Sequence, residues 1–416
     1  MNYNEQNGFD GEKKTPWYLQ ADEPAPKDYN PYEDTPSVFE EIYEENKQNL
    51  GGVKQHEWES PMMYEERRAR ESIMLRASAS QKLKQTVTGI SVILLIALLM
   101  MTSLITSVSG FSQMIPEKYY NLFTDVLMVL QYVAVFPIVF YIATVGQRDK
   151  IRTYFKKPAV SKFYTFRFIM IMLGITYAVA ILSDIIFGYL GEHIHINDLS
   201  TPLPSGVAEH ILYFLAVVVC APIFEELLFR GILLKRLSGF GEWFAVIVTA
   251  ILFGMYHQNH AQLFFTAAFG VLAGFLAIRS KSIIPTIIAH ACLNGYSYLN
   301  TLFLTFTDNY EEYMASTEVA LKGPTPIIAI IGILNLLIYV FIIVGITMLI
   351  TEIASNKAQF SLKKGDSGLG AGEKVLGLLS SPVMILLLLI LISNIIIVSF
   401  VDIEPLLQEL TELATY

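Results

Sequence analysis

Nine long apolar segments, separated by short polar stretches, take up most of the chain after residue 85. They cover residues 86–108, 121–145, 163–190, 207–234, 241–257, 262–278, 283–303, 325–351 and 377–401. Most are close to the ~20 residues that an α-helix needs to cross the hydrocarbon core of a bilayer, whereas the fifth and sixth are shorter. The pattern predicts an all-α polytopic membrane protein, embedded in the lipid bilayer through about eight to nine transmembrane helices.

The distribution of Lys and Arg between these segments predicts how the chain is oriented. Basic residues gather before the first segment, in 146–162, just after the fourth and sixth segments, and in 352–376, whereas the stretches between hold few or none. Basic loops remain on the cytoplasmic side of a membrane. The alternation therefore predicts a cytoplasmic N-terminus and a C-terminus on the outer side.

The net charge of −9 comes from the N-terminal tail. Residues 1–60 hold 14 Asp and Glu against 5 Lys and Arg, and their lack of apolar periodicity predicts disorder. Residues 61–85 are basic and are interpreted as a positive juxtamembrane end, with a short amphipathic helix on the inner leaflet as the alternative. The predicted divisions are a disordered cytoplasmic tail (1–83), accessory transmembrane helices (84–162), a core (163–303) and C-terminal transmembrane helices (304–416).

Three charged residues interrupt the fourth apolar segment within six positions, namely Glu225, Glu226 and Arg230. A charge at the bilayer centre costs about 2.5–3.5 kcal/mol on the insertion scale, so such residues need a structural or functional reason. Glu226 and Arg230 are four residues apart, share one helix face and can form an ion pair. Glu225 is rotated from Glu226 by about 100° and lacks that partner. Pro222, just before them, removes one backbone donor and predicts a kink or a free carbonyl.

Further polar residues lie in the fifth and seventh segments. Phe253 and His257 share one helix face, and His290 and Asn294 share another in the same way. At ~1.5 Å per residue, Glu225, both histidines and the asparagine are predicted to meet in one layer of the membrane. Cys220 and Cys292 lie in apolar segments, which predicts small buried thiols and not a disulfide framework.

This set of side chains suits hydrolysis of an amide inside the membrane. A desolvated glutamate can take a proton from water, and Asn and His donors can stabilise an oxyanion in a dry site. The same glutamate and histidines could instead hold zinc as two imidazoles and a carboxylate, with water in the fourth place. A zinc-protease HExxH motif is absent, because His56-Glu57 is followed by Trp58, Glu59 and Ser60 in the polar tail.

The three spaced pairs, in this order on successive helices, resemble the motifs of the CPBP intramembrane proteases (CAAX protease and bacteriocin-processing; Abi/Rce1-like). The motifs read Glu225-Glu226-x-x-x-Arg230, Phe253-x-x-x-His257 and His290-x-x-x-Asn294. Each is weak alone, since Glu65-Glu66-x-x-x-Arg70 in the tail also matches the first one. The resemblance implies that residues 163–303 are the protease core.

The resemblance also implies a role for each motif residue. Glu225 would activate water with the help of His257, while His290 and Asn294 would hold the oxyanion. The structural or substrate-orienting residues would be Glu226, Arg230 and Phe253. The family implies either no cofactor, which we favour, or zinc held by Glu225, His257 and His290.

The predicted function is therefore an intramembrane endopeptidase of the bacterial plasma membrane, acting on a membrane-anchored protein or peptide. Nothing in the sequence suggests a nucleic-acid partner, and it sets neither the oligomeric state nor whether the substrate is prenylated. Two other functions remain open at this stage. One is a non-catalytic immunity or scaffold protein that binds a membrane peptide, and the other is a proton-coupled transporter that uses Glu225.

Overall fold

A computed structural model describes residues 60–112, 115–116, 119–145, 151–197, 203–309, 320–355, 360–365 and 367–402, with side chains omitted for 104–112. All regular elements in these ranges are helical, which confirms the predicted all-α class. Seven helices in the described residues are long and apolar enough to cross a membrane, and α9 is a shorter apolar helix. The chain is thus a multi-pass membrane protein, whereas its orientation stays a prediction.

The helices follow the predicted segments closely. The first half contains α2 (Pro61–Ser112), α3 (Tyr120–Leu130), the π-helical η3 (Gln131–Val135), α4 (Phe136–Thr144), a 3₁₀ turn η4 (Ile151–Thr153) and α5 (Lys162–Gly191). The fourth segment is α6 (Val207–Phe214), π-helical η5 (Leu215–Cys220), α7 (Ala221–Glu226), π-helical η6 (Leu227–Leu233) and α8 (Leu234–Ser238). The remainder contains α9 (Glu242–Tyr256), α10 (His260–Ser280), α11 (Ile284–Leu304), α13 (Thr325–Ser355), α14 (Ala371–Leu379) and α15 (Pro382–Phe400).

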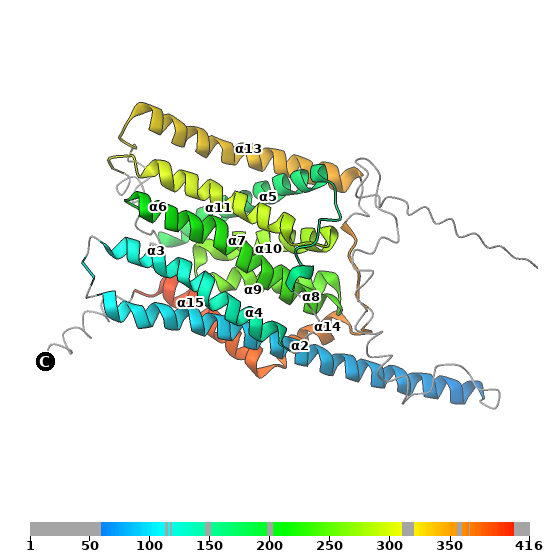
Figure 1. The fold of residues 1–416 in the computed structure, drawn as a ribbon. Helices are drawn as coiled ribbons and strands as arrows, with labels where there is room; N and C mark the ends of the chain where they lie inside the picture. Colours follow the sequence, from blue (N-terminus) through cyan, green and yellow to red (C-terminus); the bar gives the residue numbers. More distant parts are fainter. Residues whose placement is uncertain are drawn as a thin grey trace, which may run out of the picture.

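Three sequence predictions need correction. The basic juxtamembrane end is neither disordered nor a separate surface helix, because α2 begins at Pro61 and extends past the other helices (Figure 1). The ninth segment begins at Pro382 and not at 377, since α14 ends at Leu379. Both cysteines are free, but Cys292 is exposed and Cys220 is only half-buried. The predicted disorder of residues 1–59 lies outside the described residues.

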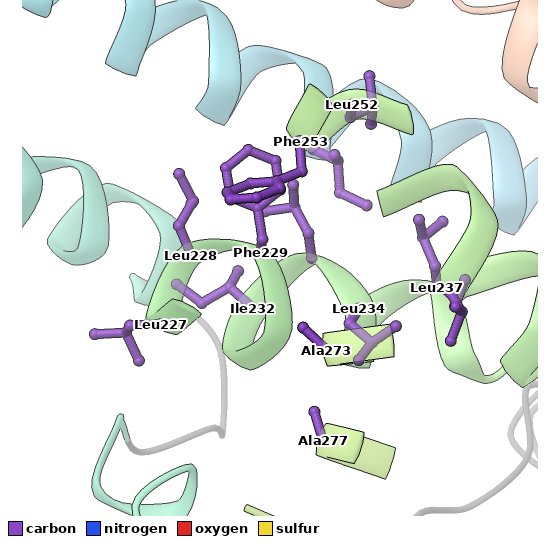
Figure 2. Packing of buried hydrophobic residues seen from close by; sticks show 14 of the residues in the cluster. Leu227, Leu228, Phe229, Ile232, Leu234, Leu237, Leu252, Phe253, Ala273 and Ala277 are labelled. Atoms are coloured by element: carbon purple, nitrogen blue, oxygen red, sulfur yellow. The ribbon is translucent and has the colours of Figure 1, made fainter. Parts of the chain in front are cut away.

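The fourth segment and helices α9 and α10 form the centre of the bundle. Side chains of η6 and α8 pack against α9 and α10 in one buried cluster, whose members include Leu227, Leu228, Phe229, Ile232, Leu234, Leu237, Leu252, Phe253, Ala273 and Ala277 (Figure 2). Helices α9 and α10 approach each other closely at Gly270, since a Cβ there would lie 2.9 Å from Cα of Ala250. This packing fixes the two motif-bearing helices against each other.

Helix α13 packs on α5 through a contact between glycines. A Cβ on Gly345 of α13 would lie 2.6 Å from the carbonyl oxygen of Met170 and 2.8 Å from Cα of Gly174, both on α5. Arg167 of α5 also donates to the Glu352 carboxylate of α13 at 2.5 Å. Small residues at such a crossing let two membrane helices approach closely.

Replacing Gly345 with alanine should loosen this crossing, because the added methyl group meets backbone atoms that cannot rotate away. We expect a destabilisation of about 1–3 kcal/mol, as for other overpacked sites. Thermal unfolding of the purified protein in detergent measures it. Gly332→Ala in the same helix is the matched control, since nothing lies within 4 Å of a Cβ there. Equal melting temperatures for the two variants would contradict the proposed role of the glycine contact.

Candidate active site

The two glutamates lie on α7, a six-residue α-helical stretch between two π-helical segments. Pro222 lies in the first turn of α7 and cannot donate a backbone hydrogen bond, so the widened η5 turn before it agrees with the predicted disruption. π-Helical turns inside α-helices occur frequently at functional sites. The local backbone irregularity therefore coincides with the charged part of the span.

Glu226 is fully buried and has two polar partners. Its Oε1 accepts a hydrogen bond from Arg230 Nη1 at 2.9 Å, which confirms the ion pair predicted from the i,i+4 spacing. The same oxygen lies 3.1 Å from Nδ1 of His290 on α11. Since a carboxylate oxygen accepts, His290 Nδ1 carries the donated proton. Glu226 thus connects the fourth span to α11 and fixes the orientation of the His290 ring.

Arg230 is also buried, and its charge has a second partner. The centre of its guanidinium lies 4.2 Å from the centroid of the Phe253 ring on α9, a cation–π geometry. The same ring contacts His257 edge to face at 4.8 Å between centroids and His290 at 6.0 Å. Phe253, predicted to be structural or substrate-orienting, therefore lies between the ion pair and both histidines.

Glu225 points to a different side of the helix, as the helical phase predicted. Its Oε1 accepts a hydrogen bond from the Tyr132 hydroxyl at 2.8 Å, and its Oε2 lies 4.0 Å from Nε2 of His290. The Glu225 side chain is 16% exposed, whereas that of Glu226 is 0% exposed. His290 therefore lies between the two carboxylates, with Nδ1 on the buried one and Nε2 facing the accessible one.

His257 and Asn294 complete the predicted set, with different outcomes. Nδ1 of His257 lies 2.8 Å from the carbonyl oxygen of Phe253, and only a protonated Nδ1 can make that bond. Nε2 of His257 is then the nitrogen with a free lone pair. Asn294 donates its amide to the carbonyl of Val217 in η5 at 2.8 Å. Within the described residues, Asn294 has no hydrogen bond to the other candidates.

Tyr132 was not predicted from the sequence, which assigned span tyrosines to the core or to the aromatic belt. It lies in η3, in the second span, 93 positions before Glu225. The only local signal is the neighbouring polar residue Gln131 in an otherwise apolar run. Its contact with Glu225 depends on how two distant spans pack, and spacing along one helix carries no information on that.

The zinc hypothesis can be compared with the side-chain arrangement. The donor chemistry is suitable, because both histidines donate through Nδ1 and keep Nε2 for another partner, as metal-bound histidines do. The geometry is not suitable, because no three His, Cys, Asp or Glu side chains in the described residues form a group that could hold a metal ion. We therefore derive no step through a metal.

The fold and the site together define a polytopic membrane protein with a carboxylate–histidine cluster between its central helices. A family model described as Rce1-like, type II CAAX prenyl endopeptidase Rce1-like, matches residues 207–296, which contain every motif residue named above. This match supports the resemblance to the CPBP family that the three motifs carry. Comparisons with curated proteins and with solved structures gave no match.

Proposed function

We propose that the protein is an intramembrane endopeptidase in which Glu225 activates the attacking water. The observation that supports this most directly is the placement of the Glu225 carboxylate, partly accessible and 4.0 Å from His290 Nε2. This separation is too long for a direct hydrogen bond, and one water molecule can bridge it. The match of residues 207–296 to a protease family model supports the same chemistry.

The proposed reaction follows from the roles that these groups can take. Oε2 of Glu225 accepts a proton from water while the water oxygen forms a bond to the scissile carbonyl carbon. His257, with its Nδ1 proton held by Phe253, presents Nε2 to the same water. The proton on Glu225 then passes to the leaving amine as the C–N bond breaks. Glutamate returns to its ionised form, and one water molecule is consumed.

The oxyanion formed on attack needs hydrogen-bond donors. His290, oriented through Nδ1 by the buried Glu226 carboxylate, can donate from Nε2 when it is protonated. The amide of Asn294 keeps a second N–H after donating to Val217, and we assign that N–H to the oxyanion. Glu226 and Arg230 then act by holding His290 and the helix in place.

We propose a membrane-anchored protein or peptide as the substrate, prenylated or not, because the site lies between membrane helices. The test compares membrane proteomes of cells that carry the wild-type protein or Glu225→Ala, with labelling of new protein N-termini. The expected result is a small set of termini, at cleavage sites next to membrane segments, that disappear in the variant. Identical sets of termini would argue against proteolysis.

We further propose that hydrolysis requires no metal ion. Activity of the purified protein should be within about twofold after treatment with a strong chelator, because the glutamate alone supplies the base. Elemental analysis of the same sample checks for tightly held zinc. Loss of activity on chelation with recovery on adding zinc would replace this mechanism by the one in which Glu225, His257 and His290 are ligands.

A further inference from the structure

The hydroxyl of Tyr132 donates to Oε1 of Glu225 at 2.8 Å, although the two residues come from different spans. Tyr132 belongs to the second span, before the family-matched region at residues 207–296. The sequence assigned residues 84–162 to accessory helices. A residue from that part nevertheless contacts the carboxylate on which the proposed function depends.

The Tyr132 ring is held in this orientation by other aromatic rings. It is stacked on Phe136 at 5.5 Å and on Phe224, the residue before Glu225, at 6.1 Å between centroids. Phe224 also packs against Phe136 at 5.6 Å. Such ring pairs add stability beyond area burial. The rings of the two spans thus form one cluster that fixes where the hydroxyl lies before any substrate arrives.

This contact selects which oxygen of Glu225 can react. Because Oε1 accepts from Tyr132, Oε2 is the oxygen left facing His290. The bond is charge-assisted and lies in a poorly hydrated site, where such bonds are strong.

We infer that Tyr132 is a positioning residue for Glu225, so that the active site is completed by a span outside the matched region. The inference rests on the proposed function, because it takes Glu225 as the base. Tyr132 does not contact the reacting carbonyl in this scheme. It acts by orienting the carboxylate.

The test replaces Tyr132 with phenylalanine, which keeps the ring stacking and removes only the hydroxyl. We expect kcat for a fluorogenic peptide to fall about 10- to 100-fold, with KM changed less than about twofold, because the lost bond is to a charged group. Because the hydroxyl orients the base and does not bind the substrate, the loss should appear in kcat and not in KM.

Tyr177→Phe is the matched control, because it removes the hydroxyl of another buried tyrosine that has no hydrogen-bond partner within the described residues. It should leave kcat and KM unchanged. The amount of folded enzyme in each sample is measured from its thermal unfolding and used to correct kcat, so the comparison remains decisive even if Tyr132→Phe folds less well. A corrected kcat for Tyr132→Phe equal to that of Tyr177→Phe would overturn the inference.

Glu225→Gln, measured beside them, separates this inference from the proposed function. If Glu225→Gln is inactive and Tyr132→Phe matches the control in kcat and KM, only the role of Tyr132 fails. If Glu225→Gln keeps full activity, the proposed function itself fails, whatever Tyr132→Phe does.

Discussion

Replacing Glu225 with glutamine should abolish peptide hydrolysis and leave the protein folded. Glutamine has nearly the same shape and can still accept a hydrogen bond from the Tyr132 hydroxyl, so the helix packing should persist. It cannot take a proton from water. Loss of a general base lowers the rate by about 10²- to 10⁴-fold. The measurement is kcat for a fluorogenic peptide, with purified protein in detergent and the melting temperature recorded for each sample.

The control for Glu225→Gln is a carboxylate of the same protein that lies in a span but outside the site. Asp184 of α5 is exposed, and Asp184→Asn removes one negative charge from a candidate span in the same way. It should retain full activity. Unchanged hydrolysis by Glu225→Gln would exclude this residue as the base. Proton flux in proteoliposomes that disappears in Glu225→Gln, with no peptidase activity in the wild type, would instead support a transporter.

Helical phase explains why so much of the site could be read from the sequence. Contacts between residues four apart depend only on the geometry of one helix, so the Glu226–Arg230 pair and the separate direction of Glu225 were predictable. Charged side chains are costly inside a membrane, so these residues stand out in an apolar span. The same reasoning put Phe253 and His257 on one face, and in the structure their rings contact each other while Phe253 also lies beside Arg230 and His290.

Contacts between helices were less predictable. The positions of the residues along the helices could place His290 near the glutamates. They could not show that its Nδ1 donates to Glu226 and that its Nε2 faces Glu225. Tyr132 was missed for the same reason, because its partner lies on another span. Asn294 also could not be placed from its spacing. It donates to the carbonyl of Val217 in the widened η5 turn and not to the other candidate residues.

Some helix boundaries are likewise set by residues at the boundary itself, and others by packing against distant parts of the chain. The break before α15 is encoded locally, because Ser381 caps the helix by accepting from Met384 N, and Pro382 follows at its start. A Ser-Pro pair in an apolar run therefore marks the start of a helix, and a hydropathy pattern alone does not detect it. The straight continuation of α2 from Pro61 has another cause, since α14 packs beside it and Gly377 faces Leu83.

Removing the charge of Arg230 should destabilise the folded protein strongly. Arg230→Met leaves the Glu226 carboxylate buried without its charged partner and also removes the cation–π contact with Phe253. Breaking a buried ion pair from one side costs about 3–5 kcal/mol, because the other charge stays uncompensated. Thermal unfolding in detergent should show a large loss of stability, and peptidase activity should fall with the displaced His290.

The double variant Glu226→Gln/Arg230→Met tests whether the pair is responsible, because it removes both charges together. It should be less destabilised than Arg230→Met alone, since no unpaired charge remains. The matched control is the motif-like pair in α2, where Arg70 lies 3.7 Å from Glu66 and the two side chains are 75% and 59% exposed. Arg70→Met should cost no more than about 1 kcal/mol, because water screens an exposed pair. Both pairs have the same i,i+4 spacing, so the expected difference in stability comes from burial. Equal losses of stability in Arg70→Met and Arg230→Met would contradict a role of burial in the Glu226–Arg230 pair.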